Sequence, residues 1–167
     1  MGVTIQKIVV TGTISLMLAI ANTASANNLK QCSSAPLIVT LKNVGKVTYF
    51  AEDCSKSWEN QNIRLDFQYT HDIPEWAFKK AATYYLKKNI SDFSDQSPLN
   101  QMTTLYKPVK SGDIYSLSYH QDNQKLDLIL NQKLLGSIRD AHANYYFKIW
   151  FGSAPFNVKL KQQLLNR

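Results

Sequence analysis

The sequence has few histidines and cysteines, and these do not stand at the spacings of known catalytic or metal-binding motifs. The three histidines, His71, His120 and His142, lie far apart, and none has the i, i+4 partner of a helix-borne metal site. The sequence contains no G-x-S-x-G motif of a nucleophilic serine, no glycine-rich phosphate loop and no dinucleotide-binding motif. We therefore expect no metal and no cofactor, and no motif in the sequence requires the protein to be an enzyme.

The two cysteines, Cys32 and Cys54, are the remaining reactive side chains and are 22 residues apart. In an oxidising compartment, two cysteines in one small domain indicate a disulfide. Two free thiols or a metal-binding pair are the alternatives, but a metal pair lacks further Cys or His at ligand spacing. We expect a disulfide that ties the segment around Cys32 to the segment after the first long strand. If residues 1–26 are a cleaved signal peptide, as argued next, Cys32 lies near the start of the mature chain.

The first 26 residues have the pattern of a secretory signal peptide. Lys7 gives a positive start, an apolar run follows over residues 8–20, and Ala24 and Ala26 form an A-x-A cleavage site. An uncleaved anchor is the alternative, but a spanning helix needs roughly 20 apolar residues, more than this run supplies. This predicts an exported, periplasmic protein whose mature chain, residues 27–167, has no second apolar run long enough to span a bilayer.

The chain is basic, with a net charge of +7 and a pI near 9.4. A basic balance raises the question of nucleic acid or anionic lipid as a partner. The lysines are scattered, no run exceeds two, and no stripe of basic residues interleaved with aromatic residues occurs. We expect no nucleic-acid binding, and the charge is typical of a soluble surface.

The elements that must position any site are clearest in the second half of the chain. Segments 115–119 and 126–130 carry apolar side chains at every second position, which is the period of a strand with one buried face. Polar breaks at 121–124 and 131–132 have hairpin length. After residue 140 the apolar spacing becomes helical, and Gly152 can end the helix. The helical apolar positions are Ala143, Tyr146, Phe147 and Trp150.

The first half predicts further strands at 37–41, 47–50 and 62–70, the last with clean alternation of apolar and polar residues. Residues 43–45, Asn-Val-Gly, indicate a turn between the first two. A helix begins near Pro74, with Asp72 as its cap and with Ala77, Ala81, Tyr84 and Tyr85 as one buried stripe. Together these elements predict a single α+β domain over residues 27–167.

The order of these motifs resembles the bacterial chalcone isomerase-like family. It runs K-x-G-D-x-Y-x-L-x-Y, a hairpin, L-G-x-I-x-D, an aromatic helix ending I-W-F-G, a proline, then L-K-x-x-L-L, and it covers roughly residues 44–167. The resemblance implies an open-faced antiparallel β-sheet with helices packed on one face. The matching residues are Lys110, Gly112, Asp113, Tyr115, Leu117 and Tyr119, then Leu135, Gly136, Ile138 and Asp140, then Ile149 to Gly152, Pro155, Leu160, Lys161, Leu164 and Leu165.

The chain departs from the family pattern after Phe50. A polar segment, A-E-D-C-S-K-S-W-E-N, stands where such proteins continue with an aromatic strand that helps to line the ligand cleft. The plant flavonoid cyclases of the family hold a phenolate with an arginine, but segment 41–50 has no arginine. An isomerase or intramolecular lyase would have to use Lys46, Thr48 and Tyr49 in its place.

The resemblance implies two functions. The first is an exported, non-catalytic module for an apolar or amphipathic ligand such as a fatty acid, or for an unidentified partner protein. Its ligand would lie between the sheet and the helices, with a lysine or Arg64 meeting a carboxylate. The second is an isomerase or intramolecular lyase related to chalcone–flavanone isomerase. The ligand-contacting aromatic residues expected for the first function are Tyr115, Tyr119, Tyr146 and Trp150, all of which also suit a plain core.

Overall fold

The structure, a computed structural model, describes residues 29–166. The predicted signal peptide and its cleavage site lie outside the described residues. Six antiparallel strands form one sheet, and their order in the sheet is their order in the sequence. The strands are β1 (Lys30–Val39), β2 (Lys42–Ala51), β3 (Ile63–Tyr69), β4 (Ile114–His120), β5 (Lys125–Leu130) and β6 (Lys133–Arg139).

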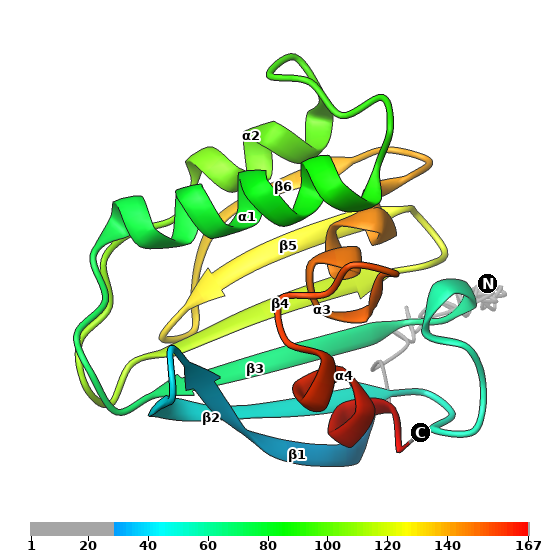
Figure 1. Cartoon of the computed structure of the whole chain (residues 1–167). Coiled ribbons are helices and arrows are strands. Elements are labelled where there is room, and N and C mark those ends of the chain that lie inside the picture. The colour runs from blue at the N-terminus through cyan, green and yellow to red at the C-terminus, as the bar shows by residue number, and fades with distance from the viewer. Residues whose placement is uncertain (1–28, 167) are drawn as a thin grey trace, which may run out of the picture.

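The helices lie in front of one face of this sheet (Figure 1). The α2 helix packs on β6 at one edge, α4 packs on β1 at the other, and α3 contacts both α1 and α4. The predicted open-faced α+β architecture is therefore confirmed. The helices are α1 (Glu75–Asn89), α2 (Pro98–Thr104), α3 (Lys148–Phe151) and α4 (Val158–Leu165), with short 3-10 helices η1 (Trp58–Asn60) and η2 (Ala143–Phe147).

The core forms between the sheet and the helices because alternate strand residues point to that side. In β3 the residues Ile63, Leu65 and Phe67 are buried, while Arg64 and Asp66 between them are partly exposed. Trp150 lies against the sheet, with its ring centroid 4.9 Å from that of Phe67. The aromatic segment after β6 thus lies against the sheet, as the change in sequence period predicted, but it forms a 3-10 helix and a four-residue α-helix in place of one continuous helix.

The first hairpin differs from the expectation. The chain turns at Thr40 and Leu41, whose φ angles are 47° and 67°, and the predicted turn at residues 43–45 is wrong. Two left-handed residues make the tight hairpin whose twist matches the flanking strands. Gly45 instead lies inside β2, where an added Cβ would be 2.1 Å from the carbonyl oxygen of Gln68. This glycine permits a close approach of β3 and does not mark a turn.

The start of α1 also differs. Pro74 is the residue before the helix, and no side chain caps it. The Asp72 carboxylate, predicted as the cap, accepts a hydrogen bond from the Ser111 backbone N–H at 3.0 Å. The predicted buried stripe is corrected as well, because Tyr84 is 51% exposed and the fully buried positions of α1 are Ala82 and Leu86.

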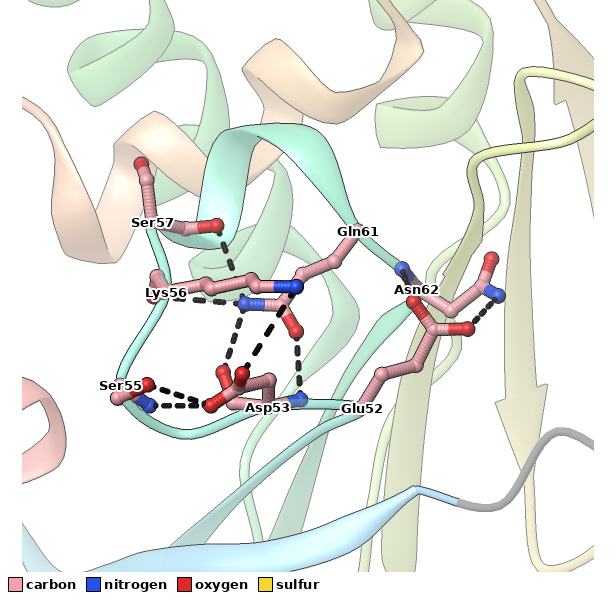
Figure 2. A network of polar contacts seen from close by, with 7 residues as sticks. All are labelled: Glu52, Asp53, Ser55, Lys56, Ser57, Gln61 and Asn62. Atoms are coloured by element: carbon pink, nitrogen blue, oxygen red, sulfur yellow. Dashed lines mark hydrogen bonds and ion pairs between the residues drawn. The ribbon is translucent and has the colours of Figure 1, made fainter.

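The polar segment after β2 folds into a compact loop around the buried side chain of Gln61 (Figure 2). The Gln61 Oε1 accepts a hydrogen bond from the Asp53 N–H at 2.8 Å, and its Nε2 donates to the carbonyl oxygens of Asp53 at 3.0 Å and Ser57 at 3.1 Å. Cys54 of this loop forms a disulfide with Cys32 in β1, as expected. The loop is thus closed by its own amide and fixed to the edge strand.

We expect Gln61→Glu to lower the free energy of unfolding by about 2 kcal/mol, because a carboxylate would face the carbonyl oxygens that the amide now serves as donor. Denaturant unfolding at neutral pH measures the loss. Gln163→Glu, at an exposed position of α4, is the matched control and should change stability by less than about 0.5 kcal/mol. Equal losses in both variants would contradict this role for Gln61.

Candidate functional site

A cavity of about 240 Å³ lies between the sheet and the helices. Its floor is built by inward-facing residues of β1 to β5, among them Phe67 and Leu117. Its walls come from α1, through Ala77, Ala81 and Phe78, and from the segment that runs from α3 to α4. This segment contributes Ile149, Trp150 and Phe156.

The lining is apolar apart from the tyrosine hydroxyl groups and the indole N–H of Trp150, and no charged side chain belongs to it. The tyrosines are Tyr69, Tyr106 and Tyr115, and each has a ring contact with Phe78. Small alanines on α1 leave the space that larger residues would fill. The arrangement suits an uncharged, chain-like or flat apolar group, because an ionised group buried without a partner is strongly disfavoured.

The three hydroxyl groups differ in their partners. The Tyr115 hydroxyl donates to the Lys107 carbonyl oxygen at 2.9 Å and accepts from the Lys107 N–H at 2.7 Å, so the protein occupies it fully. The Tyr106 hydroxyl is hydrogen-bonded to that of Tyr146. Burial raises the pKa of Tyr106, and neighbouring Tyr146 raises it further. The Tyr69 hydroxyl has no hydrogen bond to any residue in 29–166, although Tyr69 is only 5% exposed.

Burial raises the pKa of Tyr69 above its usual value, and nearby Tyr115 adds to this effect. The hydroxyl therefore stays protonated at neutral pH, and it can donate a hydrogen bond to an oxygen of a bound molecule. Because no residue in 29–166 pairs with it, this hydroxyl is available to a molecule in the cavity. Tyr69 is thus well suited to meet a polar atom of a ligand in this cavity.

Of the predicted ligand-binding residues, two line the cavity: Tyr115 and Trp150. Tyr119 and Tyr146 are buried but belong to the core beside it, and the Tyr146 hydroxyl lies 3.2 Å from that of Thr103. The fifth residue, Arg64, lies on the opposite face of the sheet. Its Nε is 3.0 Å from Asp66 Oδ1, and its guanidinium carbon lies 4.3 Å from the centroid of the Phe50 ring.

The candidate catalytic residues are not brought together. Tyr49 points into the core, where its ring packs 5.3 Å from that of Phe151. Lys46 and Thr48 alternate with it in β2 and lie on the other face, where the Thr48 hydroxyl is 3.2 Å from that of Ser34. A reaction that needs all three side chains at one bound substrate has no common site here.

Sequence reasoning missed Tyr69, Phe78 and Tyr106 as cavity residues. Tyr69 ends the alternating strand β3, so its inward direction was readable from the spacing. Tyr106 lies in a loop after α2, and no periodic signal marks it. Among residues 29–166, no cluster of three or more His, Cys, Asp or Glu could hold a metal ion, and no helix is long and apolar enough to cross a bilayer.

Comparison with known proteins places the chain among relatives of this fold. The sequence model of the family described as "Chalcone isomerase-like" matches residues 50–166. A search of curated proteins by sequence gives no match. Among solved structures, a fatty-acid binding protein of Arabidopsis thaliana is similar, with a TM-score of 0.63 and 13% sequence identity. The similarity covers 83% of this chain and 87% of that chain, and at this identity it establishes the shared fold alone.

Proposed function

Because this chain belongs to the chalcone isomerase-like family, we propose that it is an exported, non-catalytic protein that binds a small apolar or amphipathic ligand, such as a fatty acid. The observation that carries the proposal is the cavity of about 240 Å³ between sheet and helices, which is lined by apolar side chains with one unpartnered hydroxyl. The name of the similar plant protein, a fatty-acid binding protein, agrees with a ligand of this class.

In this proposal the apolar chain fills the space beside Phe67, Leu117 and Trp150, and an oxygen of the protonated, uncharged head group accepts a hydrogen bond from Tyr69. Apolar burial supplies most of the affinity, because the cavity offers no cation to an ionised carboxylate. The related intramolecular lyase activity has less support, since Tyr49 lies on the opposite face of the sheet from Lys46 and Thr48. Export rests on the sequence pattern of the first 26 residues.

A series of saturated fatty acids of increasing length tests the proposal by isothermal titration calorimetry on delipidated protein. Each buried methylene contributes about 0.8 kcal/mol, so the affinity should rise about fourfold per added methylene until the cavity is full. Native mass spectrometry of the protein as purified identifies any ligand that it already carries. Failure of every chain length to bind, or turnover of a chalcone by the purified protein, would overturn the proposal.

The Tyr69→Phe variant tests the polar contact. Its affinity for the best fatty acid should fall about tenfold, because a hydrogen bond to a carboxyl group is lost, while its stability should hardly change. Tyr115→Phe is the contrasting control. This variant should lose about 1–2 kcal/mol of stability, because its hydroxyl bridges the Lys107 backbone. Unchanged affinity in Tyr69→Phe would place the head group elsewhere.

A further inference from the structure

The cavity opens beside apolar side chains that are exposed to solvent. Val39 lines the cavity and is 37% exposed, and Leu41, two residues further on in the turn between β1 and β2, is 98% exposed. Val158 begins α4 and is 60% exposed, and it follows the cavity residue Phe156 closely in the chain. The Asn157 side chain joins the two segments, since its Nδ2 donates to the Ile38 carbonyl oxygen at 3.5 Å.

The α1 helix adds a third side to this opening. Ala77, Ala81, Tyr84 and Lys88 follow one another at i, i+4, i+7 and i+11, so they lie along one face of α1. The first two line the cavity, and Tyr84 is 51% exposed, with Lys88 Nζ 4.7 Å from its ring centroid. We define the mouth surface as Val39, Leu41, Tyr84 and Val158.

Within the segments that carry the mouth surface, the charged side chains are of one sign. The segments that carry it, residues 30–51, 76–91 and 141–166, contain lysines and no Asp or Glu, and all 12 acidic residues lie in 52–75 and 92–140. Lys42 and Lys159 are direct neighbours of Leu41 and Val158 and are exposed. Two acidic residues closely precede segment 76–91: Asp72, just before α1, accepts a hydrogen bond from the Ser111 backbone N–H, and Glu75, the first residue of α1, pairs with Lys79.

We propose that the mouth surface docks on an anionic phospholipid bilayer, with Leu41 inserted among the acyl chains and the neighbouring lysines against the phosphate groups. Apolar tips flanked by lysines suit an interface that is apolar inside and negatively charged outside. Docking would set the cavity opening against the membrane, so that an apolar ligand could pass between bilayer and cavity without crossing water. The docking itself does not depend on which ligand the cavity holds.

Cosedimentation with vesicles tests the docking. The full chain is expressed, protein is purified from the soluble fraction, and its N-terminus is determined by mass spectrometry. We expect binding to vesicles of equal parts phosphatidylglycerol and phosphatidylcholine, and at least tenfold weaker binding to phosphatidylcholine alone or in high salt. Leu41→Ser should weaken binding about tenfold, because one leucine no longer leaves water.

Leu134→Ser is the matched control, because Leu134 is 52% exposed on β6 and does not line the cavity. It should bind vesicles as the parent does. The docking would be overturned if both variants weakened binding equally, or if the parent did not bind anionic vesicles. It would also be overturned if sedimentation equilibrium showed that the parent self-associates and that Leu41→Ser abolishes this self-association. Fatty-acid titration without vesicles separates this result from the proposed function, since Leu41→Ser should retain its ligand affinity there.

Discussion

Replacing Ala82 with phenylalanine is expected to weaken fatty-acid binding at least a hundredfold. Ala82 lines the cavity from α1 and is only 4% exposed, so the added ring has the cavity itself as its nearest free space. A ring in that space displaces the acyl chain, and each excluded methylene costs about 0.8 kcal/mol of binding. Calorimetric titration with the tightest-binding fatty acid measures the effect.

Stability provides the internal check on this variant. The ring gains contacts by filling an apolar void, and this gain offsets the cost of overpacking, which is about 1–3 kcal/mol. The fold should therefore persist with a similar melting temperature. Thr83→Phe places the same ring at the adjacent position, which does not line the cavity, and it should bind as the parent does. If Ala82→Phe fails to fold, Ala77→Phe tests the same space from the partly exposed rim. A folded variant of either kind with parental affinity would show that the ligand lies elsewhere.

The second large effect is expected at Asn89, the last residue of α1. Its Nδ2 donates to the carbonyl oxygens of Tyr85 and Ala154, both at 2.8 Å, and its Oδ1 accepts from the Ala154 N–H at 2.9 Å. An added Cβ at Gly152 would lie 2.2 Å from this Oδ1, so the glycine lets the chain approach the amide. One side chain thus ties α1 to the segment that forms the far wall of the cavity.

We expect Asn89→Asp to lower the free energy of unfolding by about 3 kcal/mol, because a carboxylate would face two carbonyl oxygens that now receive hydrogen bonds. In a domain of this size the melting temperature should fall by roughly 10 °C. Ligand affinity should fall as well, since two cavity walls lose their connection. Thermal unfolding followed by circular dichroism measures the stability change.

Asn100→Asp is the control for the chemical change itself. The Asn100 Nδ2 makes one exposed hydrogen bond, to the Asp95 carbonyl oxygen at 3.0 Å, so its loss should cost less than about 1 kcal/mol. A melting temperature of Asn89→Asp equal to that of Asn100→Asp would contradict the role assigned to Asn89.

Much of the fold was predictable because its signals are local. Alternation in β3, β4 and β5 and the helical spacing after residue 140 each follow from which side chains must leave water. The turn between β1 and β2 was not predictable from composition. Thr40 and Leu41 take left-handed conformations that neither residue favours alone, and Gly45 serves a neighbouring strand that is distant in sequence.

The same division holds for the candidate site. The alternation of β3 already places Arg64 on the face opposite Leu65, so its separation from the cavity was readable from the sequence. The spacing also placed Tyr115 and Trp150 on the covered side. It could not show that Tyr119 and Tyr146 lie outside the cavity lining, because buried residues of one face look alike in sequence.

By itself, the sequence determined that this protein is an antiparallel sheet covered on one side, of the chalcone isomerase-like family, with a cysteine pair placed to form a disulfide. Hydrophobic periodicity and motif order are properties of the sequence, so they can be recognised without coordinates. Only the tertiary structure decided that Tyr69, Phe78 and Trp150 enclose a space and that Tyr69 keeps a free hydroxyl there. A cavity is what packing leaves unfilled, and this depends on how separate segments meet.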